Sequence, residues 1–284
     1  SGPAWFDRGG MAGVAWWNDR GVADHYNFVG VGDQYDFERK SPWTDDDNAG
    51  WGSSYSDSEG RVIAGNSFDF PYIHGLSVMA AGKSFVSVSD EVFNREDFDL
   101  KSWCAVDLLF GEEKTTASVY EPGKKDFQIY TPEFLRSLER LKEASLPLFM
   151  SGAYTGTDLV MLADTAVAAR VMKTLHFKPR TDHAVTTGRL YATDIAGPDF
   201  TGSYSFNTGS VDNIYPAEAP DAIEPADKLS STAFRYTENN TSAAIIHRGE
   251  VRSFVMGFPF ETIMSQDERD ELMKQVLNFL LKIK

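Results

Sequence analysis

The chain has 284 residues, of which 42% are hydrophobic and 24% are charged, so it can form a sizeable core and is not expected to be wholly disordered. Its formal net charge of −15 disfavours binding to nucleic acid or to an anionic membrane surface, because phosphate contacts need clustered Lys and Arg. No apolar run approaches the roughly 18 residues that a membrane-spanning helix needs, so we expect no membrane span.

Residues 1–60 are rich in Gly, Asp, Trp and Tyr and show little periodicity. Disordered segments are usually poor in aromatic residues, so we expect a loop-rich arm that packs on the main body, with Trp43 or Trp51 buried. Its run Asp45-Asp46-Asp47-Asn48 offers hard oxygen ligands for calcium, but it lacks the spacing of a calcium loop. A solvated acidic turn is the interpretation that we favour for this run.

From residue 61 the pattern becomes regular. Short β-branched or apolar runs predict strands at Arg61–Gly65, Ser84–Ser89, Cys104–Phe110 and Pro147–Gly152. The only cysteine, Cys104, lies in one of these runs, so we interpret it as a small buried hydrophobic residue rather than as a catalytic thiol.

Three helices are expected from their start signals. Thr131-Pro132-Glu133 supplies a cap, a proline suited to the first turn and an acidic residue at the positive end of the helix. Thr157–Leu175 is apolar on most sides and predicts one long buried helix. Ser265-Gln266-Asp267-Glu268 is a capping box that opens the terminal helix.

Residues 184–258 differ because β-like segments follow one another through turns, as around Arg248-Gly249-Glu250. We interpret this part as an antiparallel extension of the sheet. Together the patterns predict an α/β domain over residues 61–284, with a mostly parallel central sheet flanked by helices, preceded by the arm of residues 1–60.

Ligands of open α/β sheets bind beyond the carboxyl ends of the strands, and this rule selects the candidate residues. The proposed catalytic side chains are Tyr154, Glu261, Asp90 and Glu91, because paired carboxylates suit acid–base chemistry on sugars. The candidate ligand-binding residues at the same edge are Asn66, Asp69, His74, Thr155 and Asp158. No HExxH or comparable metal-ligand spacing occurs, so we expect no metal and no other cofactor.

The segment Ser151-Gly152-Ala153-Tyr154-Thr155-Gly156 is a strand followed by a glycine-flanked turn and a helix, which is the layout of a nucleophile elbow. Together with the order of elements and the late Gly257-Phe258-Pro259-Phe260-Glu261, it resembles the class I glutamine amidotransferase-like fold, which is flavodoxin-like. In active members the elbow carries Cys, and a His and a Glu follow a late strand. Here Tyr154 stands at the nucleophile position, Glu261 near the acid, and Phe258-Pro259 where the histidine would be.

A second resemblance covers the whole chain. It rests on Ser41–Asp47, Val62–Gly75, Ser151–Tyr154 and Gly257–Thr262. These segments resemble a domain of large secreted bacterial proteins, often labelled xanthan lyase or N-acetylmuramoyl-L-alanine amidase, which can carry a golvesin C-terminal-like domain. The resemblance implies a secreted, periplasmic or cell-surface location, a glycan ligand, and further domains in the same polypeptide as partners.

Two functions remain open from the sequence. One is a non-catalytic domain, a pseudoenzyme that binds glycans or acts as a scaffold in polysaccharide or cell-wall processing; its basis is the absence of Cys and His at the matching positions. The alternative is a polysaccharide lyase or hydrolase that uses the strand-end carboxylates with Tyr154, and in a lyase Tyr154 would form an acid–base pair with His74.

Overall fold

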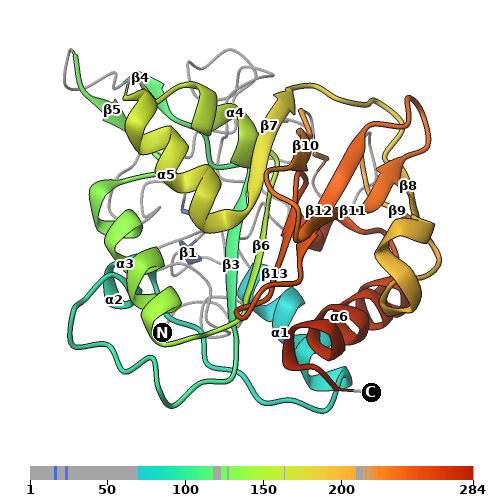
Figure 1. Cartoon of the computed structure of the whole chain (residues 1–284), viewed down its shortest axis with the longest axis horizontal. Coiled ribbons are helices and arrows are strands. Elements are labelled where there is room, and N and C mark those ends of the chain that lie inside the picture. The colour runs from blue at the N-terminus through green and yellow to red at the C-terminus, as the bar shows by residue number, and fades with distance from the viewer. Residues whose placement is uncertain are drawn as a thin grey trace.

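The structure is a computed structural model, and Figure 1 gives its course. The residues that it describes are 16–17, 23–24, 70–117, 123–126, 128–162, 164–208, 214, 216–217 and 219–283. The expected arm, apart from the backbone of β1 (Trp16–Trp17) and β2 (Ala23–Asp24), and the expected strand at residues 61–65 lie outside these residues.

A seven-stranded mixed sheet forms the centre of the domain, in the order β3-β6-β13-β12-β11-β8-β9 (Figure 1). Its strands are β3 (Val106–Gly111), β6 (Leu148–Gly152), β8 (Arg189–Ala192), β9 (Ser203–Ser205), β11 (Ser230–Tyr236), β12 (Ser242–His247) and β13 (Ser253–Met256).

Only β3, β6 and β13 pair in parallel, and the other four strand pairs are antiparallel. The expected α/β class and the antiparallel extension are therefore confirmed, but the expectation of a mostly parallel sheet is wrong. Helices connect strands before residue 184, whereas β11, β12 and β13 follow one another through short turns, which favours antiparallel pairing.

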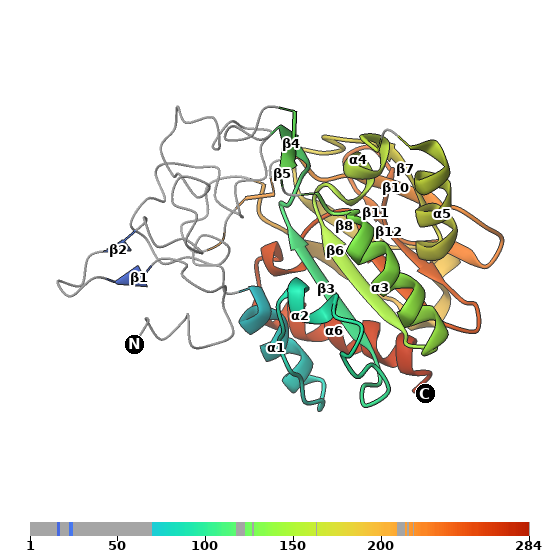
Figure 2. The same ribbon diagram turned by 90° about the vertical axis from the view of Figure 1, so that its left-hand side faces the viewer.

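Helices cover both faces of the sheet (Figures 1 and 2). Helices α1 (Phe70–Ala80) and α6 (Gln266–Leu281) pack on one face, where Phe149 and Phe254 belong to the same core cluster as Val276 and Phe279. Helices α3 (Pro132–Glu143) and α5 (Thr165–Leu175) cover the other face, over a core that includes Met150 of β6. Successive residues of β6 thus point to opposite cores, as strand geometry requires.

Two of the predicted helix starts are confirmed. Thr131 caps α3, with its side chain accepting a hydrogen bond from the Phe134 N–H, and Pro132 occupies the first turn. Ser265 caps α6 through the Glu268 N–H. The expected single helix from Thr157 to Leu175 is wrong, because α4 (Thr155–Val160) ends before α5 begins.

The break between α4 and α5 has a local cause. Asp164 is the N-cap of α5, and its carboxylate accepts hydrogen bonds from the N–H groups of Ala166 and Val167 at 2.8 and 3.2 Å. Asp favours caps over helix interiors, so this residue starts a new helix.

The expected strand at Ser84–Ser89 is also wrong, since these residues have no regular structure and Val86 and Val88 are exposed. Phe85 lies over α1 instead: a Cβ atom at Gly75 would come within 2.1 Å of its ring. Cys104 is exposed and precedes β3, so its expected burial is wrong as well.

The remaining elements are short. They are α2 (Asp90–Phe93), the 3-10 helices η4 (Asp194–Asp199) and η5 (Phe260–Thr262), and the two-stranded ladders β1–β2, β4–β5 (Thr116–Ala117 with Lys125–Asp126) and β7–β10 (Phe177–Thr181 with Ala222–Pro225). Among the described residues, no helix combines the length and the apolar character that crossing a membrane requires.

Candidate functional site

Tyr154 lies where the sequence predicts the elbow, between β6 and α4, and is the N-cap residue of α4. Its backbone is unstrained, with φ −110° and ψ 20°, and its side chain is only 1% exposed. The ammonium of Lys114 lies over the phenol ring, 4.8 Å from its centre. The ring therefore packs under a cation instead of projecting into solvent.

The flanking glycines allow close packing. A Cβ atom at Gly152 would lie 2.8 Å from the Cβ of Phe110, and one at Gly156 would lie 3.1 Å from an oxygen of Asp221. Neither glycine has a positive φ. The glycines are thus needed because neighbouring segments approach the turn, and the turn does not have the strained backbone of a nucleophile elbow.

A carboxylate already occupies the N-terminus of α4. Asp221, which is 1% exposed, accepts hydrogen bonds from the N–H groups of Gly156 and Thr157 at 2.6 and 2.8 Å and from the Thr157 hydroxyl at 2.6 Å. Burial raises the pKa of Asp221 to about 7, although the hydrogen bonds from Thr157 and Gly156 oppose the shift. The N–H groups that could bind an anionic ligand at this helix start bond to the side chain of Asp221 instead.

Asp158 and Thr155 are both buried within α4. The Asp158 carboxylate accepts hydrogen bonds from the N–H and hydroxyl of Thr115, at 2.6 and 2.8 Å, and from the N–H of Ile129 at 2.9 Å. The carbonyl of Thr155 accepts one from the Tyr130 hydroxyl at 2.7 Å. Asp158 thus links the segments at Thr115 and Ile129 to α4, so its role is structural.

Acidic groups do meet at this end of the sheet. Asp90 and Glu91 begin α2 at the surface, and Glu113 follows β3. Burial, together with the negative charges of Asp90 and Asp158, raises the pKa of Glu113 to about 8. At neutral pH Glu113 therefore carries a proton beside two carboxyl groups, which is the state of a general acid.

Glu261 belongs to a different cluster, on the α1–α6 face of the sheet. His74 of α1 lies between two carboxyl groups: its Nδ1 is 2.7 Å from Asp107 of β3, and its Nε2 is 3.1 Å from Glu261 of η5. His74 and Glu261 are buried, and the ring of His74 contacts those of Phe149 and Phe260.

The environment of His74 favours its charged form. Burial alone would lower the pKa of His74, but the charges of Asp107 and Glu261 and their hydrogen bonds outweigh this effect and raise it to about 9. The cluster is a buried cation held by two carboxylates. A protonated His74 cannot act as a base, which weakens its pairing with Tyr154 in a lyase mechanism.

The expected site residues therefore divide into three groups. Asp90, Asp158 and Tyr154 lie near the carboxyl end of the parallel strands, whereas His74 and Glu261 form a buried ion cluster. Asn66, Asp69 and the acidic run 45–48 lie outside the described residues.

Sequence reasoning missed three residues of these clusters. Asp107 carried a signal, since it is a lone charge in an apolar strand. Glu113 and Asp221 follow no motif, and only the folded chain brings Asp221 to the start of α4.

Comparison with known proteins adds no family: no protein-family model matches the chain, and no curated protein is significantly similar to it.

Proposed function

We propose that this domain is a non-catalytic module of a larger secreted or cell-surface bacterial protein, and that it binds a glycan in polysaccharide or cell-wall processing. The observation that carries the proposal is the state of the turn at Tyr154, where the side chain is buried and the N–H groups that follow are already bonded to Asp221. An elbow nucleophile needs an exposed side chain and free N–H donors for the developing oxyanion. Here Tyr154 is buried, and the N–H groups of Gly156 and Thr157 bind Asp221.

The charge of the chain favours a neutral glycan over a polyanion. The chain has a net charge of −15, and Asp90 and Glu91 are exposed, with Asp90 close enough to Glu113, which follows β3, to act on its pKa. Carboxylates repel an acidic sugar unless a cation intervenes. The resemblance to domains of secreted polysaccharide-processing proteins supports a glycan as the ligand.

The proposal is tested by measuring binding and turnover side by side. Purified protein is titrated with neutral and acidic oligosaccharides while tryptophan fluorescence is followed. It is then incubated with xanthan and peptidoglycan fragments while release of reducing and unsaturated ends is measured. We expect binding of a neutral oligosaccharide and no turnover. Turnover that disappears in Tyr154→Phe would contradict the proposal, and so would failure to bind any neutral glycan.

A second function is favoured by the protonated Glu113, because a neutral carboxylic acid beside two carboxyl groups can protonate a glycosidic oxygen. In a polysaccharide hydrolase or lyase, Glu113 would be the acid and Asp90 the base. Its rate would fall as pH rises through about 8, when Glu113 loses its proton. Glu113→Gln would abolish turnover, whereas the exposed control Glu96→Gln would leave it unchanged. Equal rates in both variants would exclude this mechanism.

A further inference from the structure

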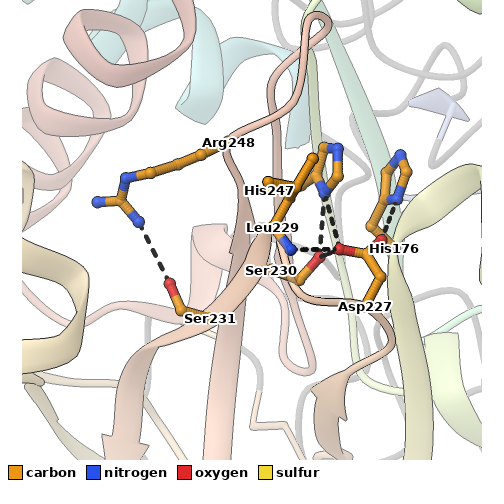
Figure 3. A network of polar contacts seen from close by, with 7 residues as sticks. All are labelled: His176, Asp227, Leu229, Ser230, Ser231, His247 and Arg248. Atoms are coloured by element: carbon orange, nitrogen blue, oxygen red, sulfur yellow. Dashed lines mark hydrogen bonds and ion pairs between the residues drawn. The ribbon is translucent and has the colours of Figure 1, made fainter.

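A further polar cluster consists of His176, Asp227 and His247, which come from three different parts of the chain (Figure 3). His176 follows α5, Asp227 lies in the turn between β10 and β11, and His247 ends β12. Two imidazoles and a carboxylate, each offering one atom, lie within 4.8 Å of one another. None of these residues belongs to the site proposed above.

Asp227 is the centre of the cluster. Its Oδ2 lies 2.6 Å from Nδ1 of His176, and its Oδ1 lies 3.5 Å from Nδ1 of His247. Oδ1 also accepts hydrogen bonds from the Leu229 N–H at 2.9 Å and from the Ser230 hydroxyl at 3.0 Å. These two donors fix the carboxylate, as outer partners of a metal-binding carboxylate do.

The surrounding chain limits where each histidine can lie. His176 adopts the left-handed conformation, with φ 62°, at the end of α5. The ring of His247 lies against Gly249, where a Cβ atom would come within 2.2 Å of its Nε2. The two rings are stacked, with centres 3.3 Å apart and planes 6° apart.

The cluster is unsuited to nucleophilic catalysis. In a Ser-His-Asp triad the serine and the aspartate contact different nitrogens of the histidine. Here the Ser230 hydroxyl and Asp227 both face Nδ1 of His247, and that hydroxyl also bonds to Asp227 directly. The arrangement instead gathers ligand atoms around one point.

We propose that His176, Asp227 and His247 form a binding site for a divalent transition-metal ion of the zinc type. Imidazole nitrogen with one carboxylate oxygen is a ligand set that Zn²⁺ accepts, whereas Mg²⁺ and Ca²⁺ prefer oxygen alone. Three protein ligands leave one position of a tetrahedral ion for water or a ligand.

The change needed for binding is small. Ligands about 2.0–2.1 Å from a tetrahedral ion lie roughly 3.4 Å apart, so the present spacings of 2.6 to 4.8 Å require only side-chain rotation. The ring of His176 must turn so that its Nδ1 points to the same place as Nδ1 of His247. His176 and Asp227 have side chains that are 26% and 38% exposed, which gives them room to turn and the ion a path of entry.

The test is a titration of the whole chain with Zn²⁺ by calorimetry, repeated with Co²⁺ by visible absorption. The variants are His176→Asn and Asp227→Asn. The control is His183→Asn, because His183 also has a positive φ, 43°, and also lies near a carboxylate, 3.6 Å from Asp182. Asn tolerates this backbone conformation, so neither His variant adds backbone strain.

We expect one tight site per chain in the wild type and in the control, and a loss of affinity of at least about tenfold in each cluster variant. Thermal melting supplies a second readout: Zn²⁺ should raise the melting temperature of the wild type and the control, and not that of His176→Asn. Failure of the wild type to bind Zn²⁺ would overturn the proposal, as would equal affinity in all four proteins.

Discussion

The buried His74 predicts that the protein loses stability as the solution becomes alkaline. The pKa of His74 is about 9 in the folded protein, against an ordinary value of 6.5. The folded chain thus binds this proton more tightly than the unfolded chain does. The resulting stabilisation is complete below pH 6.5, declines as pH rises, and is lost above about pH 9.

The size of this effect follows from the shift. Each pKa unit corresponds to about 1.4 kcal/mol, so the contribution of His74 is roughly 3 kcal/mol. The side chain is buried, so solvent does not screen it appreciably. The raised pKa values of Glu113 and Asp221, about 8 and about 7, act in the same direction, so the effect of His74 must be measured as a difference between proteins.

The measurement is urea unfolding of the wild type and of His74→Gln at several pH values from about 6 to about 10. The free energy of unfolding of the wild type should fall by roughly 3 kcal/mol more than that of the variant over this range. His183→Gln, at an exposed histidine, should keep the wild-type dependence. If His74→Gln and the wild type have the same pH dependence, His74 is not a buried cation and the reasoning fails.

Three further substitutions test the packing around the elbow and the helix starts, each by urea unfolding. Asp221→Ala leaves the first N–H groups of α4 without their acceptor and should cost about 2–4 kcal/mol, while Asp221→Asn keeps an acceptor and should cost less; an equal cost would contradict this account. Gly152→Ala places a Cβ 2.8 Å from that of Phe110 and should cost about 1–3 kcal/mol, so an unchanged stability would show that the strands can move apart. Thr131→Ala removes the cap of α3 and should cost about 1 kcal/mol, which Thr131→Ser should largely restore.

The elements that the sequence predicts well are those whose signals are local. Thr131, Pro132 and Ser265 mark helix starts through bonds to residues three positions away. The strands of the antiparallel extension alternate with turn residues, and their order in the chain is their order in the sheet from β11 to β13. Helix starts and hairpins of this kind can be predicted without knowing the rest of the fold.

Two of the wrong predictions, the strand at Ser84–Ser89 and the single helix Thr157–Leu175, have different causes. Ser84–Ser89 has the composition of a strand, but Phe85 packs over Gly75, two segments that only the folded chain brings together. Asp164 is a typical N-cap residue and does start a helix. The apolar residues on both sides of it instead predict one continuous helix.

The candidate sites show the same division. Tyr154 stands at the predicted turn, because strand, glycine and helix are contiguous in the chain. That Asp221 fills the start of α4 could not be predicted, since sixty-five residues separate it from Gly156. His176 and His247 likewise meet only because α5 and β12 end at the same place, and no residue spacing in the sequence predicts that contact.

The position of β13 has a consequence for how the chain assembles. This strand pairs with β12 as a hairpin on one side and with the distant β6 in parallel on the other. The antiparallel strands can therefore form early through short loops, whereas the β3–β6 pair must wait to dock on a finished edge. In pulse-labelling hydrogen exchange, we expect amides of β12 to gain protection before those of β6. A chain emerging from the ribosome would then hold the β3–β6 pair without its neighbour in the sheet until β13 is made.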